Sequence, residues 1–510
     1  MGKIYKEVEL FAHTQPNKIA YISDDVVLSY SQLHSHVDSM SDKLVSVVSP
    51  SSSTVAIVFD ESEISVILIL ALNKLGVTIV PLNPAYQSSQ ISLLIKSAMA
   101  DVILVSSKYS TKLDQADVST CSILIVDNIK TNQSSGCNIQ NHDYADNKPF
   151  LITLSSGSTG EPKPIIFTEK NKIDRSKQAV DLYGISQQDK ILCASPFFHS
   201  LGQRLTFLPL IHGATLVHLS RFNVDSWVKM VERHGVTCTI SVSSHLQELS
   251  DVLITQPERF SSLRCLVSSS AAISNETKTR LFEALGCDFH EMYGASEVAT
   301  ATSLNKYQAS EKPNSVGFPC LGVKIRIYSE QLKSLKCGEV GEIGVFSPLA
   351  SPGYLGKDGL NTVSFCEDGF FLTGDLGYLD EDGFLYFINR KKEMIIAGGI
   401  NIYPSDIERV LSSDSRVGLC VVIGMADDYL GEVPVAVIVT SENSDKRQLE
   451  IELRKLARQY LASFQLPLKY FFYDAIPLTA SGKLDRIAIT KNINAMGFNL
   501  SSKLRFLNKN

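Results

Sequence analysis

A glycine-rich loop that ends in a lysine is the segment whose residue types point most clearly to chemistry. It follows the apolar stretch Phe150–Leu154 and runs Ser155-Ser156-Gly157-Ser158-Thr159-Gly160-Glu161-Pro162-Lys163. The glycines let backbone amides converge on an anion, the hydroxyls can donate, and Lys163 adds a positive charge. Charge-assisted hydrogen bonds of this kind contribute about 1.5–3 kcal/mol each. The loop therefore predicts a phosphate-type anion site, although by itself it leaves a Ser/Gly-rich surface turn open.

Several familiar reaction types are disfavoured by the motifs. Lys163 stands between Pro162 and Pro164, which does not fit the P-loop pattern of kinases and GTPases. The sequence contains neither His-Glu-x-x-His nor Gly-x-Ser-x-Gly, so zincins and serine hydrolases are excluded on motif grounds. Cys287 and His290 are three apart in a predicted strand, where they would face opposite sides, and we expect no zinc site there.

Six segments resemble, in the same order along the chain, the motifs of the adenylate-forming superfamily of acyl- and aryl-CoA synthetases, peptide adenylation domains and luciferases. The loop 155–163 resembles the family's phosphate loop. The other five are Pro196-Phe197-Phe198-His199-Ser200, Met292-Tyr293-Gly294-Ala295-Ser296-Glu297, Leu372-Thr373-Gly374-Asp375, the stretch from Arg390 to Glu408, and Ser481-Gly482-Lys483. The resemblance implies ATP-dependent activation of a carboxylic acid to an acyl-adenylate with release of pyrophosphate, followed by transfer to the thiol of CoA.

The resemblance also implies which residues bind the nucleotide. They are Ser155, Ser156, Gly157, Ser158, Thr159, Gly160, Lys163, Ser270, Tyr293, Gly294, Asp375 and Arg390. Tyr293 would stack on adenine, and Asp375, assisted by Arg390, would accept hydrogen bonds from the ribose. The simpler alternatives are a core tyrosine at 293 and a turn-capping aspartate at 375.

Catalytic roles follow from the same resemblance for Lys483, Ser296, Glu297 and His199. Glu297 would bind Mg²⁺, a hard cation that prefers oxygen ligands. Ser296 replaces the family's usual Thr and keeps a hydroxyl for a phosphate oxygen. Lys483 would bridge the acid and the α-phosphate and stabilise charge that develops in the transition state.

The resemblance assigns a hinge, a thiol channel and an acyl pocket as well. Lys392 would be the hinge about which the C-terminal domain rotates between two half-reactions, and Gly398 and Gly399 would line the thiol channel. The residues expected to line the acyl pocket are His199, Arg204, Met292 and Ala295. Arg204 could pair with a second carboxylate or another polar group of the substrate. The alternatives are an outward or salt-bridged arginine at 204 and a packing histidine at 199.

The sequence restricts the acid and its acceptor only in part. Phe198-His199-Ser200 stands where amino-acid-activating relatives carry an Asp, so an amino acid substrate is disfavoured. Ser268-Ser269-Ser270 replaces the usual Ser-Gly-Gly and would narrow the pocket or add hydrogen bonds. The 27 residues from 484 to 510 are too few for a carrier bundle. The acceptor is therefore expected to be CoA, with the phosphopantetheine of a separate carrier protein or an amine as alternatives. A different class of function also stays open, in which the chain is a non-catalytic nucleotide-binding relative of these enzymes.

The elements that must position these residues alternate between short apolar runs and amphipathic stretches. Expected strands are Val55–Phe59, Val77–Pro81, Val102–Val105, Ile123–Val126, Leu151–Leu154, Thr215–Leu219, Thr237–Val242 and Leu263–Val267, with helices at Glu63–Leu75, Val224–His234 and Asn275–Leu285. This alternation predicts an α/β fold with parallel βαβ sheets covered by helices. We expect an N-terminal domain over 1–389, with a small β-barrel unit at about 315–389, and a smaller mobile α+β domain over 390–510.

Composition sets the remaining expectations. The chain has 510 residues, 44% of them apolar, and 48 Lys and Arg against 54 Asp and Glu give a net charge of −6. This charge argues against nucleic acid as a partner. The sequence has no apolar run long enough to span a membrane, and Met1 to Glu9 lacks the apolar segment of a signal peptide, so we expect a cytoplasmic protein without an integral membrane segment.

Overall fold

The computed structural model divides by internal contacts into two units. Unit 1 comprises Met1–Lys324 and Phe346–Phe371, and unit 2 comprises Ile325–Val345 and Leu372–Asn510. The structure describes residues 1–49, 53–126, 147–156, 162–270, 273–356, 364–366, 368–398, 400–427, 430–441, 445–479 and 484–496. The expected domain boundary between 389 and 390 falls inside unit 2 and stays a prediction.

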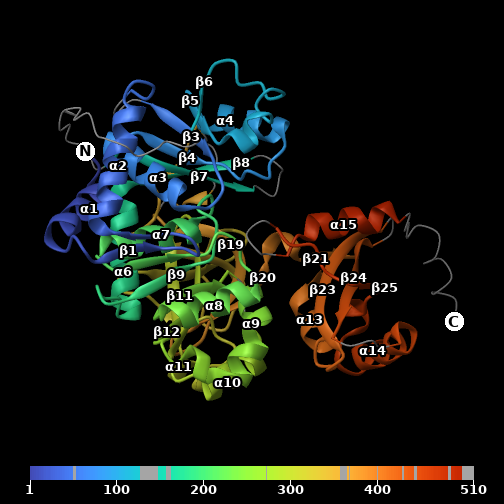
Figure 1. The fold of residues 1–510 in the computed structure, drawn as a ribbon. Helices are drawn as coiled ribbons and strands as arrows, with labels where there is room; N and C mark the ends of the chain where they lie inside the picture. Colours follow the sequence, from blue (N-terminus) through green and yellow to red (C-terminus); the bar gives the residue numbers. More distant parts are fainter. Residues whose placement is uncertain are drawn as a thin grey trace. The chain divides into compact units, whose positions relative to one another are not determined.

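Unit 1 contains a nine-stranded sheet whose central strands are parallel (Figure 1). In spatial order these strands are β15 (Phe318–Pro319), β14 (Ala299–Asn305), β13 (Asp288–Ala295), β12 (Cys265–Ser269), β11 (Cys238–Val242), β9 (Lys190–Cys193), β10 (Thr215–His218), β1 (Ile19–Ile22) and β2 (Val27–Ser29). Pairing is parallel from β13 through to β1 and antiparallel at both ends. Parallel strands need covering on both faces, which the expected βαβ alternation supplies.

A second, seven-stranded sheet of unit 1 carries the predicted phosphate loop. Its strands in spatial order are β18 (Gly353–Tyr354), β8 (Pro162–Thr168), β7 (Pro149–Ser156), β4 (Thr78–Pro81), β3 (Thr54–Val58), β5 (Val102–Val105) and β6 (Ser122–Ile125). Strand β3 pairs in parallel with β4 and β5, strand β5 pairs in parallel with β6, and β4 pairs in parallel with β7. Strands β7 and β8 form an antiparallel hairpin. The hairpin's connection is the glycine-rich segment.

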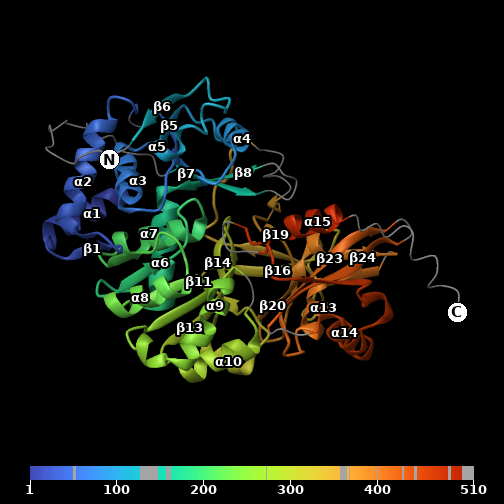
Figure 2. The same ribbon diagram turned by 45° about the vertical axis from the view of Figure 1, so that its right-hand side comes forward.

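The helices of unit 1 cover both sheets. They are α1 (Lys3–Thr14), α2 (Tyr30–Leu44), α3 (Glu63–Leu75), α4 (Ser88–Ala98), α5 (Ser107–Ser110), α6 (Glu169–Tyr183), α7 (Ser200–Ile211), α8 (Val224–His234), α9 (Ser243–Thr255), the 3₁₀ turn η1 (Pro257–Phe260), α10 (Asn275–Ala284) and α11 (Lys306–Glu311). Alternate strand residues enter different cores: Ile191 packs with α6 and α7, and its neighbour Leu192 packs with α8 to α10. Figure 2 shows α8, α9 and α10 grouped beside the nine-stranded sheet.

Helix boundaries follow the local signals in the sequence. The Ser62 side chain accepts a hydrogen bond from the Ser65 amide at the start of α3, and Gly76 ends the helix with φ of 68°. At α8 the cap is Asn223 and the end is Gly235 with φ of 62°. These side chains satisfy amides that a helix start leaves unpaired, and glycine takes the left-handed end at no steric cost. Both helices have the predicted bounds.

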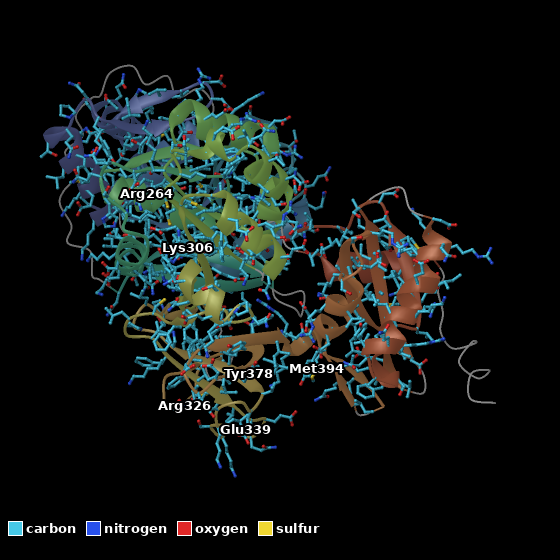
Figure 3. All side chains as sticks on the ribbon, turned by 90° about the horizontal axis from the view of Figure 1, so that it is seen from below. Arg264, Lys306, Arg326, Glu339, Tyr378 and Met394 are labelled. Carbon is cyan, nitrogen blue, oxygen red and sulfur yellow. The ribbon has the colours of Figure 1, made fainter. Side chains whose placement is uncertain are left out.

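Unit 2 combines a four-stranded antiparallel unit with an α+β domain. In spatial order, the strands of the four-stranded sheet are β16 (Lys324–Tyr328), β17 (Gly341–Phe346), β19 (Phe371–Leu379) and β20 (Leu385–Arg390). The predicted Asp-Gly hairpin is confirmed, since Tyr378, labelled in Figure 3, pairs with Tyr386 and their rings stack at 4.8 Å. The Asp380 carboxylate accepts the Phe384 amide inside this turn. These strands lie within about 315–389, where the sequence predicts a small β-barrel unit, and the assignment of that unit to the N-terminal domain stays a prediction.

The α+β domain of unit 2 has a five-stranded sheet between helices. Its elements are η2 (Lys391–Glu393), β21 (Ile395–Ala397), β22 (Ile400–Ile402), α13 (Pro404–Leu411), β23 (Val417–Asp427), β24 (Gly431–Thr440), α14 (Lys446–Tyr460), η3 (Ser463–Gln465), β25 (Lys469–Tyr473) and α15 (Arg486–Ala495). One face packs on α13 and α14, and the other packs on α15 (Figure 1). The α/β fold class is confirmed, and within the described part of the chain no helix combines the length and apolarity needed to cross a membrane.

A buried ion pair ties α10 to β13, the strand that ends in the Tyr293–Glu297 segment. Lys278 Nζ lies 2.7 Å from Glu291 Oε2, and both side chains are at most 5% exposed. Burial raises the pKa of Glu291 above 4.5, and the Lys278 charge opposes this rise. Breaking such a pair on one side leaves a charge uncompensated.

We expect Lys278→Met to lower the free energy of unfolding of unit 1 by about 3–5 kcal/mol at neutral pH. A carboxyl whose folded pKa is raised favours folding most when it is protonated, so the loss should grow as pH rises above 4.5. Urea unfolding at pH 5 and pH 8 measures both effects. Lys96→Met is the matched control, because Lys96 pairs with Asp117 at the surface, where the cost should stay below about 1 kcal/mol. Equal losses in the two variants would contradict the account.

Candidate active site

The predicted phosphate loop connects the two strands of a β-hairpin. The Cα atoms of Ser155 and Lys163 are partners across β7 and β8, as are those of Ser156 and Pro162. The loop residues Gly157, Ser158, Thr159 and Gly160 lie outside the described residues. The hairpin register brings both ends of this segment together at one edge of the seven-stranded sheet, and Lys163 is the first described side chain after the loop.

Three segments that are distant in sequence meet at Tyr354. The Lys163 ammonium lies 5.6 Å from the centroid of the Tyr354 ring, within cation–π range. The Tyr354 hydroxyl donates to Glu297 Oε1 at 2.7 Å. Strand β18 holds the tyrosine in place by pairing with β8, with Tyr354 opposite Ile165. Lys163, at the end of the predicted phosphate loop, and Glu297, the predicted metal-binding carboxylate, are therefore linked by a residue that the sequence did not single out.

The ionisation state of Tyr354 suits this linking role. Burial raises the pKa of its hydroxyl, and the Glu297 carboxylate raises it further. The hydroxyl therefore stays protonated at physiological pH and can only donate to Glu297 as a neutral group. This bond holds one carboxylate oxygen of Glu297, and no other side chain of the described residues donates to that carboxylate. No group of three His, Cys, Asp or Glu residues suited to a metal occurs among the described residues. A divalent cation would thus fit Glu297 together with oxygens of a phosphate.

The Tyr293–Glu297 segment comprises the end of β13 and the start of the tight turn into β14. Strands β13 and β14 pair with Gly294 opposite Thr300 and Ala295 opposite Ala299. A Cβ added to Gly294 would lie 2.0 Å from the Ala299 carbonyl oxygen, so only glycine fits. The Tyr293 side chain is partly buried at the end of β13, which is compatible with the predicted adenine contact.

Arg175 on α6 fixes the backbone that carries Ser296 and Glu297. Its guanidinium donates to the Ser296 carbonyl at 2.8 Å, the Glu297 carbonyl at 2.9 Å and the Leu349 carbonyl at 2.8 Å. The Ser351 amide donates to the Glu297 carbonyl at 2.6 Å. Burial and the nearby Arg204 lower the pKa of Arg175 to about 9, with Glu297 acting in the opposite sense, so the side chain remains charged at neutral pH.

The segment around His199 is held in place by a hydrogen bond to the Glu61 side chain. The Glu61 carboxylate accepts the Phe197 amide at 2.8 Å, and its other oxygen lies 3.5 Å from His218 Nε2. His199 caps the start of α7, and its ring lies 4.6 Å from that of Phe198. Gly202 brings the helix close to this segment, because a Cβ there would lie 2.1 Å from the Pro196 carbonyl oxygen.

The structure brings together two of the predicted acyl-pocket residues. Arg204 Nη1 lies 3.5 Å from Met292 Sδ, and Arg204 Nη2 donates to Thr300 Oγ1 at 2.9 Å. No hydrogen bond joins Arg204 to His199 among the described residues, although both belong to the start of α7. Ala295 lies at the end of β13 and is partly buried.

The serines that follow β12 differ in exposure. Ser268 and Ser269 are buried, and the Ser269 hydroxyl donates to the Ser241 carbonyl at 3.3 Å. Ser270 is exposed and has φ of 77°, a backbone conformation in which glycine carries no strain. The side chain at 269 therefore adds a hydrogen bond, one of the two outcomes that the sequence left open, and the nucleotide-binding role of Ser270 stays a prediction.

Unit 2 contains the two residues expected at the ribose. Arg390 Nε lies 3.1 Å from Asp375 Oδ1, and the two residues are also Cα partners across β19 and β20. Asp375 is 4% exposed, and its amide donates to Thr373 Oγ1. A left-handed Gly374, with φ of 72°, makes the bend before it. The predicted proximity of Asp375 and Arg390 is thus present in the structure.

The remaining predicted residues fall partly outside the described residues. Lys392 is exposed on η2, directly after β20. Gly398 is left-handed with φ of 56°, and its amide donates to the Leu430 carbonyl at 2.7 Å. Gly399 and Lys483 lie outside the described residues, so the thiol channel, the hinge and the catalytic lysine stay predictions.

Comparison with known proteins places the chain in a family. The family model described as AMP-binding enzyme matches residues 8–355, and the one described as AMP-binding enzyme C-terminal domain matches residues 406–483. The chain therefore belongs to the AMP-binding enzyme family, which confirms the predicted membership of the adenylate-forming superfamily.

Individual relatives match over nearly the whole chain. A 2-succinylbenzoate–CoA ligase of Bacillus pumilus is 31% identical, covering 93% of this chain and 95% of the relative. An indoleacetate–CoA ligase of Aromatoleum aromaticum is 28% identical, covering 94% and 95%. The solved O-succinylbenzoate–CoA synthetase of Bacillus subtilis, in complex with ATP and a magnesium ion, has a TM-score of 0.83 at 28% identity and covers 94% of this chain and 98% of its own.

We expect Arg175→Met to loosen the Ser296–Glu297 segment, because the carbonyls that the guanidinium binds would lose their donor. Hydrogen exchange measured by mass spectrometry should be faster in peptides covering 295–299 and 347–352 than in the wild type. Arg259→Met is the matched control, since Arg259 pairs with Glu232 near the surface of the same unit. Exchange that is unchanged in both peptides would contradict the role given to Arg175.

Proposed function

We propose that this chain is an AMP-forming acyl-CoA ligase, which activates a carboxylic acid with ATP and transfers the acyl group to CoA. The observation that carries the proposal is the contact series from Lys163 through Tyr354 to Glu297, because it places the end of the phosphate loop beside a carboxylate that is held ready for a cation. The relatives named as CoA ligases support both the acid activation and the CoA acceptor.

In the first half-reaction, a carboxylate oxygen of the acid attacks the α-phosphorus of ATP, the bond to the β-phosphate oxygen breaks, and pyrophosphate leaves. Lys163 and the loop amides offset the charge of the β- and γ-phosphates. Glu297, oriented by Tyr354, would hold Mg²⁺, which when bound would neutralise charge on the phosphate oxygens. Lys483 stabilises the charge that develops between the acid and the α-phosphate.

The nucleoside and the acyl group have their own contacts. Tyr293 stacks on adenine, and the Asp375–Arg390 pair binds the ribose hydroxyls. In the second half-reaction, the CoA thiolate attacks the acyl carbonyl carbon, the bond to the phosphate oxygen breaks, and AMP leaves. The thiol proton passes to the AMP phosphate or to solvent. The C-terminal domain turns about Lys392 between the two half-reactions, and Gly398 and Gly399 line the path of the thiol.

CoA is the acceptor that the relatives' names favour, and a separate carrier protein or an amine stays the alternative. Incubating the enzyme with ATP, Mg²⁺ and a panel of acids should return radiolabel from pyrophosphate into ATP, and adding CoA should give the acyl-CoA thioester, which mass spectrometry detects. Exchange without thioester would overturn the acceptor alone. Absence of exchange with every acid would overturn the proposed function. The cytoplasmic location expected from the sequence stays a prediction.

We expect Lys483→Ala to lower adenylation by about 10²-fold or more, as when one donor to a developing anion is lost. Transfer of a chemically synthesised acyl-adenylate to CoA should continue, because that step does not use the lysine. Pyrophosphate exchange measures the first step, and thioester formation from supplied adenylate measures the second. Lys491→Ala, an exposed lysine on α15, is the control. If the variant also fails with supplied adenylate, the role is wrong.

We expect Tyr354→Phe to raise the Mg²⁺ concentration needed for half-maximal pyrophosphate exchange by about 10-fold or more, the cost of one hydrogen bond to a charged group at about 1.5–3 kcal/mol. The ring beside Lys163 remains, and only the donor to Glu297 is lost. The KM for the acid should not change. Tyr307→Phe, at a 73% exposed tyrosine of the same unit, is the control. A change in the acid KM with no change in the Mg²⁺ requirement would contradict this role.

A further inference from the structure

Three cationic side chains lie together in unit 1 on α6 and α7. Lys172 and Arg175 are each 6% exposed, and Arg204 is partly buried beside them. The three side chains are close enough to affect one another's ionisation. Burial lowers the pKa of Lys172 well below its usual range, and the charges of Arg175 and Arg204 lower it further. Within the described residues, no carboxylate forms an ion pair with any of the three, and Glu297 acts on Arg175 only at longer range.

Two of the three cations have good partners. The Lys172 ammonium donates to Gln203 Oε1 at 2.7 Å and lies 3.8 Å from the centroid of the Phe167 ring. Arg175 donates to backbone carbonyls, as described above. These contacts bring no negative charge to the cluster, so Arg175 and Arg204 keep a positive potential that favours an anion nearby.

Arg204 is the member whose hydrogen bonds are incomplete. Among the described residues its short contact is Nη2 to Thr300 Oγ1 at 2.9 Å, and Gln178 Oε1 and Met292 Sδ lie at 3.5 Å. Its Nε atom is buried and has no acceptor among the described residues. A thioether sulfur is a weak acceptor, and a guanidinium offers a planar fork of donors that matches a carboxylate. Charged side chains held away from water are normally paired with an opposite charge, and no carboxylate of the described residues pairs with the partly buried Arg204.

The surroundings of Arg204 place that anion beside the reacting groups. Thr300 is the strand partner of Gly294, and Met292 belongs to the same strand as Tyr293. Arg204 itself lies on α7, the helix that His199 caps. The other groups close enough to be affected by its charge are Tyr183 and Cys320, which burial keeps neutral by raising their pKa values. Neither Tyr183 nor Cys320 therefore brings a negative charge to the guanidinium.

We propose, resting on the proposed function, that the acid activated by this chain carries a second anionic group and that Arg204 binds it. The reacting carboxylate goes to the phosphate side, and the second carboxylate, or a sulfonate of similar geometry, takes the acceptor position that Met292 sulfur now fills poorly. Arg204 is then the residue that determines specificity for dianionic acids over monoanionic acids of the same size. Thr300 acts as a positioning residue that orients the guanidinium.

Matched acids that differ only in the second charge test the proposal. The probes are straight-chain dicarboxylic acids of four to eight carbons against their monomethyl esters, and 2-succinylbenzoate against 4-oxo-4-phenylbutanoate, which lacks the ring carboxylate. Pyrophosphate exchange with wild-type enzyme should give, for the best pair, a kcat/KM at least about 10-fold higher for the dianion. A preference for the monoanion in every pair that reacts would overturn the proposal and leave the proposed function intact. No exchange with any acid would overturn both.

Variants at Arg204 separate a binding role from a structural one. Arg204→Met should lower kcat/KM for the preferred dianion by about 10²-fold, mainly through KM, and change that of its monoanionic partner by less than about 3-fold. Arg204→Lys should fall between, because it keeps the charge and loses the fork. The KM for ATP should be unchanged in both. Arg259→Met, which removes a surface arginine of the same unit, is the control and should behave as wild type.

A readout that does not depend on turnover completes the test. The preferred dianion should raise the unfolding temperature of the wild type and of Arg259→Met, but not that of Arg204→Met, in the presence of AMP. Equal loss of dianion and monoanion turnover in Arg204→Met would show that the arginine holds the reacting carboxylate or the fold, and would overturn the proposal. A change confined to the KM for ATP would overturn it as well, because the cation cluster would then serve the nucleotide.

Discussion

Repulsion between two anions is the physical constraint on which the proposed chemistry of this chain depends. A carboxylate has to approach a triphosphate, and both lose hydration as they meet, so the protein must supply positive charge and oriented donors before the reaction begins. In unit 1 these groups come from different elements: Lys163 from the β7–β8 hairpin, Arg175 from α6 and Arg204 from α7. Each is held by contacts that leave its charge in place, namely an aromatic ring, backbone carbonyls or a hydroxyl.

The same constraint explains why the acidic residue of unit 1's site is so closely supported. Glu297 is fixed at its side chain by the Tyr354 hydroxyl and at its backbone by Arg175 and the Ser351 amide. A carboxylate held from two directions can present a free oxygen to a cation at little further entropic cost. Neither support comes from the motif that contains Glu297. The motif gives the reactive group, and a strand and a helix far away in the sequence give it its position.

Sequence reasoning recovered the parts of the chain in which local chemistry decides the outcome. The helices α3 and α8 were predicted with their observed bounds, because a capping side chain and a terminal glycine mark each end. Asp375 and Arg390 were both named from recognised motifs and lie together as an ion pair, and their role at the ribose stays a prediction. Tyr354 and Arg175 were missed, because a single tyrosine in a two-residue strand and an arginine inside a helix carry no local signal. Their roles arise from tertiary contacts with Glu297. Along the sequence, Glu297 is more than fifty residues away from Tyr354 and more than a hundred away from Arg175.

The fate of one oxygen atom tests the central claim most directly. If the acid's carboxylate attacks the α-phosphorus, an acid labelled with ¹⁸O in the reacting carboxylate should deliver one labelled oxygen to AMP for every thioester formed, and mass spectrometry of the nucleotide would detect it. Pyrophosphate should remain unlabelled. Label in inorganic phosphate with ADP as the nucleotide product, or unlabelled AMP, would contradict the account, because the acid would then have been activated without an acyl-adenylate.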